Sequence, residues 1–304
     1  MAADQELGAH RLIETKEEMT DEYRKVLEDT MRIAAALEFS TLPWAYDVFA
    51  TCPDISAKIA VAASIQDELG HAHQMFMMLR DFGYEPEHMI FSTDPNELRI
   101  FYMLQFPIRN YIEFVVAQAL LDRSGRVTTV DLEESCSYAP YRRALRKVNF
   151  EERFHVSHGE YWTKYYWNLS EKTREKVQEY LDWLFPHGLF WFGVTDDRKK
   201  RTGQIEFHIR GRSNDEMRQV WLKEVSEWAS QAGISLPVHW DEQAQRYEPE
   251  VAFPAVCDPQ ARSWIPTKVT WEQTFAQWKQ GAPGHRERIE RIQREEWGEK
   301  LWKA

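Results

Sequence analysis

Two Glu-x-x-His pairs, Glu68 with His71 and Glu152 with His155, interrupt stripes of apolar residues that have helical spacing. The first stripe is Val61, Ile65, Glu68, His71, Met75 and Met78, and the second is Tyr141, Leu145, Val148, Glu152, His155, Gly159, Trp162 and Tyr166. Residues three and four apart share one face of a helix, so each helix is expected to bury a carboxylate together with an imidazole. A buried, unpaired carboxylate is costly enough to take up a proton, and a metal ion removes that cost.

The spacing by itself is weak evidence for a metal site. A third pair, Glu85 with His88, has the same spacing but contains Pro86 and follows Gly83, which are signals for the end of a helix. The position of the other two pairs in the middle of an apolar stripe therefore carries the prediction.

Residues 1–195 are expected to be helical, because their apolar periodicity is helical and not alternating. Four bundle helices are predicted: from Thr20 or Asp21 to beyond Glu38, from Asp54 to about residue 82, from about Pro95 to beyond Leu121, and from about 139 to 167. A fifth helix is predicted to follow Ser170. Pro43 leaves the continuation of the first helix open.

The first and third helices each offer one further carboxylate. Glu38 follows Leu27, Met31 and Ala34 on an apolar stripe, whereas the third helix offers both Asp122 and Glu113. These two lie about half a turn apart, and periodicity leaves both open. Two single carboxylates with two Glu-x-x-His pairs are the ligand set of ferritin-like di-iron and di-manganese proteins. The predicted fold is therefore all-α, a ferritin-like four-helix bundle with extra helices.

Four more residues near these pairs bear on the site. Asp67 and Glu151 directly precede the two glutamates. They are either acceptors for the free nitrogens of His155 and His71 across the bundle or plain surface acids, and the sequence leaves both open. His73 and His158 are expected to line or support the site and not to bind metal.

Residues 196–304 are expected to form an extension that packs on the bundle or on a partner subunit. It includes a helix within "SNDEMRQVWLKEVSEWASQAG", a long irregular segment from Leu236 to about Thr267, and one charged helix over the last thirty residues. Residues 203–213 are ambiguous, and residues 197–201, "DRKKR", are typical of a solvated loop, with contact to phosphates as the alternative.

Composition excludes several classes of protein. The net charge of −11 argues against nucleic-acid binding. No apolar run approaches the roughly 20 residues needed to span a membrane, and the polar N-terminus is no secretory signal. Three distant cysteines, Cys52, Cys136 and Cys257, predict neither a disulfide framework nor an iron–sulfur cluster. These features predict a cytoplasmic protein.

The motifs "IQDELGH", "YAPYRRAL" followed by "EERFH", "FGVTDD" and "SNDEMRQVW", in this order, resemble the phenylacetic acid catabolic family through most of the chain. The resemblance implies that two iron ions are bound, and that Asp122 is the third-helix ligand. The ligand set that it implies is Glu38, Glu68, His71, Asp122, Glu152 and His155. Manganese is accepted by the same set.

The resemblance also implies an O2-dependent monooxygenase that epoxidises the ring of an aryl-CoA thioester, such as phenylacetyl-CoA, in aromatic catabolism. It implies a homologous non-catalytic subunit as a partner. Because the chain has no nucleotide-binding motif, NADPH electrons are expected to arrive through a separate flavin and iron–sulfur reductase. Two alternatives are a ferritin-like protein that handles iron or oxidants, which would not need the long extension, and a structural subunit without metal, against which the complete ligand set argues.

Overall fold

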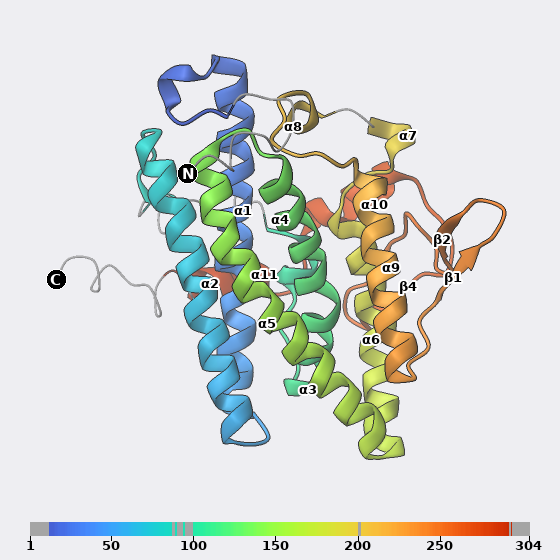
Figure 1. The fold of residues 1–304 in the computed structure, drawn as a ribbon. Coiled ribbons are helices and arrows are strands. Elements are labelled where there is room, and N and C mark those ends of the chain that lie inside the picture. The colour runs from blue at the N-terminus through green and yellow to red at the C-terminus, as the bar shows by residue number, and fades with distance from the viewer. Residues whose placement is uncertain are drawn as a thin grey trace.

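Four long helical segments lie side by side and form a bundle (Figure 1). The structure, a computed structural model, describes residues 12–86, 89, 94, 100–199, 202–291 and 293. The four segments are α1 (Asp21–Phe49), α2 (Ile55–Asp81), α5 (Ala139–Leu169), and a composite of α3 (Tyr111–Ala117), the π-helix η4 (Gln118–Asp122) and α4 (Arg123–Ser135). This architecture confirms the predicted all-α, ferritin-like class.

The ends of these helices follow their capping residues. Thr20 Oγ1 accepts a hydrogen bond from Tyr23 N at 3.2 Å, and Asp54 Oδ1 accepts one from Ala57 N at 2.8 Å. Such bonds satisfy amides that have no partner within the helix. Pro43 lies inside α1, which continues to Phe49, so the continuation that the sequence left open is present.

The third bundle helix begins later than predicted. The predicted start near Pro95 lies outside the described residues, but residues 100–110 contain only the short 3-10 helix η3 (Tyr102–Gln105). Pro107 disfavours a helix there, and Asn110 starts one, because its side chain accepts from the amides of Ile112 and Glu113 at 3.0 and 3.1 Å. The prediction of a helix through residues 100–110 is therefore wrong.

The rest of the chain adds helices and two small hairpins beside the bundle. They are α6 (Glu171–Trp191), α7 (Asp196–Lys199), α8 (Gly203–Glu206), α9 (Asn214–Ala232), β1 (Val238–Asp241) with β2 (Arg246–Pro249), β3 (Cys257–Asp258) with β4 (Ser263–Trp264), α10 (Trp271–Gln280) and α11 (His285–Arg291). A further 3-10 turn, η1 (Lys16–Glu18), precedes α1. The predicted single charged helix at the end is wrong, since Gly281 and Gly284, both with positive φ, separate α10 from α11.

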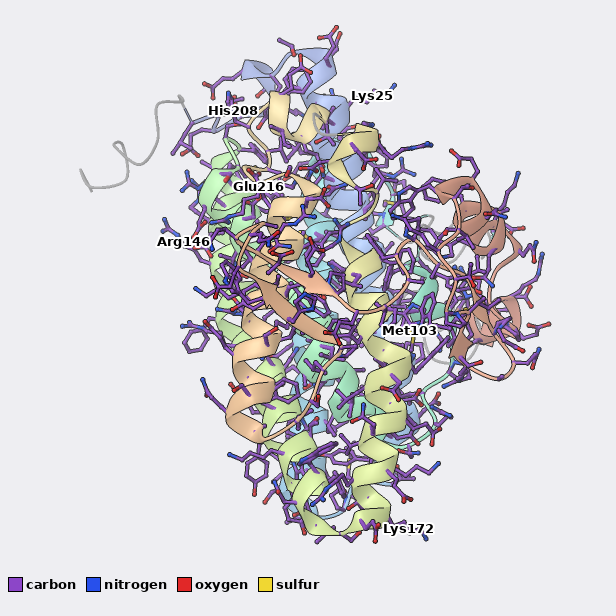
Figure 2. The ribbon with its side chains drawn as sticks, turned by 90° about the vertical axis from the view of Figure 1, so that its right-hand side faces the viewer. Lys25, Met103, Arg146, Lys172, His208 and Glu216 are labelled. Atoms are coloured by element: carbon purple, nitrogen blue, oxygen red, sulfur yellow. The ribbon has the colours of Figure 1, made fainter. Side chains whose placement is uncertain are left out.

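The extension and the bundle share one hydrophobic core. Trp221 of α9 is fully buried and donates from Nε1 to the carbonyl oxygen of Leu120 at 2.9 Å. The long axis of the molecule runs from the end that carries Lys25 and His208 to the end that carries Lys172 (Figure 2). None of the helices in the described part of the chain is long and apolar enough to cross a membrane.

Candidate metal centre

Three bundle helices bring the two Glu-x-x-His pairs and Glu38 into one cluster. Potential ligand atoms of Glu38, Glu68, His71 and Glu152 all lie within 4.8 Å of one another. His155 joins them, because its Nδ1 lies 3.3 Å from Glu68 Oε1 and 3.5 Å from Glu152 Oε1. The apolar stripes turn inward as the sequence predicts.

Both imidazoles are oriented by a carboxylate from the opposite helix. His71 Nε2 lies 3.0 Å from Glu151 Oε2, and His155 Nε2 lies 3.3 Å from Asp67 Oδ2. Of the two alternatives that the sequence leaves open for Asp67 and Glu151, the structure shows the crossed pairing with the histidines. When a ring is neutral and donates from Nε2–H to its acid, its Nδ1 lone pair faces the cluster, which is the arrangement of metal-binding histidines.

Burial and mutual charge decide the protonation of the cluster. Burial raises the pKa of the Glu68 carboxyl, an effect that His155 only partly offsets. Burial opposes protonation of His71, but the adjacent Glu38 carboxylate outweighs it and raises the pKa to about 10. The pKa of His155 is raised well above its usual value in the same way, with Glu152 as the main opposing charge. The cluster thus demands positive charge, which divalent cations would supply.

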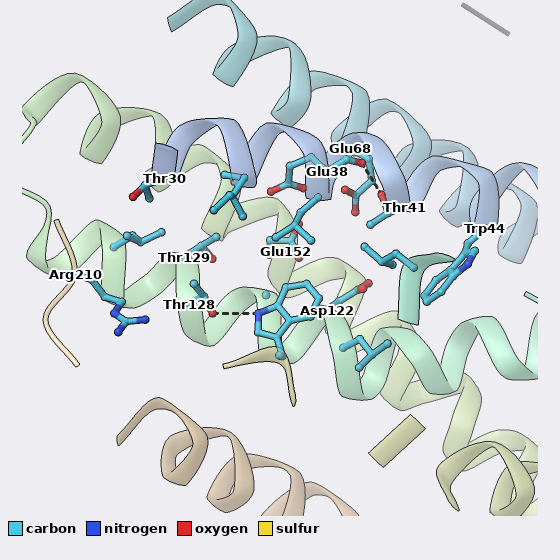
Figure 3. Close-up of a pocket in the computed structure, with 18 of the residues that line it drawn as sticks. Thr30, Glu38, Thr41, Trp44, Glu68, Asp122, Thr128, Thr129, Glu152 and Arg210 are labelled. Atoms are coloured by element: carbon cyan, nitrogen blue, oxygen red, sulfur yellow. Dashed lines mark hydrogen bonds between the residues drawn. The ribbon is translucent and has the colours of Figure 1, made fainter. Parts of the chain in front are cut away.

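Of the two acids of the third bundle helix, Asp122 lies at the end of the π-helix η4 and borders the cavity beside the cluster. Asp122 lines the same cavity as Glu38, Glu68 and Glu152 (Figure 3). Burial is the main cause that raises the pKa of Asp122 well above its usual value, and the negative charge of Glu152 raises it further. One-turn π insertions shift the residues that follow them around the helix and occur often at functional sites.

The alternative acid, Glu113, is fully buried elsewhere. Its Oε1 pairs with Arg262 Nη1 at 2.9 Å, and its Oε2 pairs with Arg109 Nε at 3.2 Å. Two cations neutralise this carboxylate, so it does not depend on a metal ion.

The remaining histidine predictions have mixed outcomes. His73 is exposed on α2, so the prediction that it lines the site is wrong. His158 is buried, but its ring nitrogens lie 3.0 Å from the hydroxyl of Tyr111 and 2.6 Å from Gln118 Oε1, not against the cluster. His88 of the third Glu-x-x-His pair lies outside the described residues, as do Lys200 and Arg201 of the basic tract.

One cavity borders the cluster along much of its lining, and a second, larger cavity shares part of that lining without contacting the cluster. The inner cavity, of about 140 Å³, has Arg210 at one end and Trp44 at the other, with Glu38, Glu68, Asp122 and Glu152 between them (Figure 3). The outer cavity, of about 440 Å³, shares part of this lining. The shared residues are Ile33, Leu37, Thr128, Trp191, Gln204 and Arg210. Neither Gln204 nor Arg210 is predictable as a lining residue from the sequence, because their segment has no periodic pattern.

Unpaired buried atoms in the cluster show that its donor set fits a metal ion. His71 Nδ1, His155 Nδ1 and Glu68 Oε2 are buried and have no hydrogen-bond partner among the described residues. Buried polar atoms are almost always paired. Carboxylate oxygens lie 3.5 Å from His71 Nδ1 and 3.3 Å from His155 Nδ1 without forming a well-aligned hydrogen bond, and a cation bound between these groups would pair them. Carboxylates with imidazoles suit iron and manganese. Fold and site together define a ferritin-like carboxylate protein with a candidate metal centre.

Comparison with known proteins identifies the family. The model of the family "Phenylacetic acid catabolic protein" matches residues 1–298, and the chain belongs to this family. The chain is similar to one of the subunits of the 1,2-phenylacetyl-CoA epoxidase of Escherichia coli (strain K12), at 24% identity over 248 residues, which is 80% of each chain.

Two solved structures of R2-like ligand-binding oxidase mutants, both with an anaerobically reconstituted Mn/Fe cofactor, align with a TM-score of 0.49 and 17% identity. The alignments cover 72% of this chain and 84% and 83% of theirs.

Proposed function

We propose that this chain is the oxygen-activating component of a multicomponent enzyme that epoxidises the aromatic ring of an aryl-CoA thioester. Membership of the phenylacetic acid catabolic protein family and similarity to an epoxidase subunit support this proposal. The substrate class is the one named by that relative, phenylacetyl-CoA.

A ring-sized cavity beside the carboxylates is the observation that carries the proposal. Its volume of about 140 Å³ is close to that of engineered apolar cavities that bind benzene, at ~150 Å³. Ile33, Leu37 and Leu121 supply apolar walls. An aromatic ring placed there would lie next to the candidate metal centre, whereas storage of iron would not need an apolar cavity at this position.

Six residues would hold two iron ions, and manganese is chemically acceptable to the same donors. They are Glu38, Glu68, His71, Asp122, Glu152 and His155. When bound, the ions supply the two-electron activation of O2 by which one oxygen atom is added to the ring and the other leaves as water. Asp67 and Glu151 would keep both imidazoles in the Nδ1-ligand orientation, and the apolar walls would contact the faces of the reacting ring.

The reaction requires partners beyond this chain. Each turnover consumes two electrons, and the sequence has no nucleotide-binding motif and only three cysteines. A separate flavin and iron–sulfur reductase that uses NADPH would deliver them. A homologous non-catalytic subunit would complete the assembly, since the similar protein is itself one subunit of an epoxidase. The complex would work in the cytoplasm.

Anaerobic reconstitution with ferrous iron tests the metal centre. We expect about two irons per chain, a clear loss in Glu68→Ala and in His155→Ala, and unchanged binding in His158→Gln. His158 is the matched control because it is a buried histidine one turn away on α5 that does not face the cluster. Absence of iron from a well-folded parent would refute the enzyme and favour a structural subunit.

Turnover tests the substrate class. The iron-loaded chain, with its partner subunit, a reductase and NADPH, is expected to convert phenylacetyl-CoA to an epoxide in proportion to the O2 consumed. If O2 is consumed at the same rate with and without the thioester, the result would instead support a protein that handles iron or oxidants.

A further inference from the structure

We propose that Arg210 binds the acyl carbonyl oxygen of the substrate at the junction of the two cavities and thereby selects thioesters. This inference rests on the proposed function, because it assumes that an aromatic acyl group occupies the inner cavity.

Arg210 lies where the two cavities meet. It lines both of them, at the end of the inner cavity opposite Trp44 (Figure 3). In an arylacetyl thioester the carbonyl carbon is separated from the ring by a single methylene group. With the ring in the inner cavity and the acyl group directed toward Arg210, the carbonyl would lie at the junction. The remaining chain of the CoA thioester would then extend into the outer cavity of about 440 Å³.

The other polar side chains at the junction already have partners. Thr128 Oγ1 donates to the carbonyl oxygen of Ser124 at 3.1 Å and accepts from Trp191 Nε1 at 3.2 Å. The Gln204 side-chain nitrogen donates to Thr30 Oγ1 at 2.9 Å. These groups hold the walls together, which leaves Arg210 as the cation available to a ligand.

The Arg210 guanidinium is buried and only partly satisfied. The residue is 8% exposed, Nη2 donates to Asn214 Oδ1 at 3.0 Å, and the buried Nε–H has no partner. Within the ranges that the structure describes, no carboxylate forms an ion pair with Arg210. Burial of this cation is costly, and the nearby charges of Asp131, Asp196 and Glu216 offset that cost only in part. Nε is not exposed to either cavity, so a ligand oxygen would bind at Nη1, which forms no hydrogen bond with the described residues.

The backbone around Arg210 is held rigidly against α4. The buried Asp131 carboxylate accepts from Gly211 N at 3.0 Å and from Arg212 N at 3.1 Å. Gly211 is packed so closely that an added Cβ would lie 2.3 Å from Ser135 Oγ. A side chain carried by such a segment is placed before the ligand arrives, as a selective binding group requires.

A ligand pair tests the assignment without turnover. Calorimetric titration of the full-length protein, with no reductase present, compares phenylacetyl-CoA with 2-phenylethyl-CoA, a thioether in which a methylene replaces the carbonyl. The parent is expected to bind the thioester about tenfold to a hundredfold more tightly, the range for a hydrogen bond to a charged group. In Arg210→Met this ratio is expected to fall to about one, while Arg126→Met keeps the parental ratio.

Arg126 is the matched control because it pairs with Glu224 on α9 and lines neither cavity. Equal affinities in the parent would overturn the role of Arg210 and leave the substrate class intact, and this comparison needs no variant to fold. A parental ratio retained in Arg210→Met, or lost in Arg126→Met, would overturn it as well. Failure of the parent to bind either compound would overturn the substrate class and this inference together.

Discussion

Gly159→Ala is expected to destabilise the protein, although alanine is the better helix former. Gly159 lies on α5 where it crosses η4, and an added Cβ would lie 2.4 Å from Ala119 N and 2.7 Å from Val115 O. Ordinary contacts begin near 3.4 Å, and these atoms belong to backbone that cannot rotate away. Overpacking of this kind costs up to ~3 kcal/mol, against a helix-propensity gain of ~1 kcal/mol. The free energy of unfolding should therefore fall by about 2 kcal/mol.

Gly70→Ala is the matched control for this substitution. Gly70 also lies within a bundle helix, α2, but an added Cβ would meet nothing within 4 Å. This variant should gain ~0.5–1 kcal/mol, because it keeps only the favourable propensity term. Urea unfolding followed by circular dichroism measures both. A Gly159→Ala protein at least as stable as the parent would refute the close-contact argument, and an equal loss in Gly70→Ala would show that the effect is not specific to the crossing.

Three further changes have expected outcomes. Burial, aided by the positive charge on His155, lowers the pKa of His158 to about 4, so its neutral form contributes stability above pH 6.5 that is lost as the pH falls towards 4. When the pH is lowered from 7 to 5, the free energy of unfolding measured with urea should fall by about 2 kcal/mol more in the parent than in His158→Gln. An equal fall in both proteins would contradict this. Glu151→Ala should weaken iron binding tenfold to a hundredfold in a chelator competition, because His71 loses its orienting acceptor; unchanged affinity would count against the metal centre. Asp131→Asn should lower the free energy of unfolding by about 3 kcal/mol, since a buried carboxylate that receives two amides and the Arg212 guanidinium is lost, and a change below ~1 kcal/mol would refute that role.

The helical framework and part of the site are predictable from local patterns. Glu68, His71, Glu152 and His155 turn inward because a helix repeats every 3.6 residues, so neighbours along the chain define which face is buried. The caps at Thr20 and Asp54 are equally local. The same logic fails at the third bundle helix, where nearly every side is apolar and no stripe distinguishes one face.

Relations between distant segments are decided only by the tertiary structure. Glu113 faces away from the cluster because Arg262, 149 residues later, neutralises it, whereas Asp122 faces the cavity after a π insertion packed against Gly159. Arg210 reaches the junction from a segment without periodicity, held there by contacts to α4. Periodicity in the sequence determines which helix faces are buried, but the partners of a buried charge depend on long-range packing, and that packing decides how the cavity is lined.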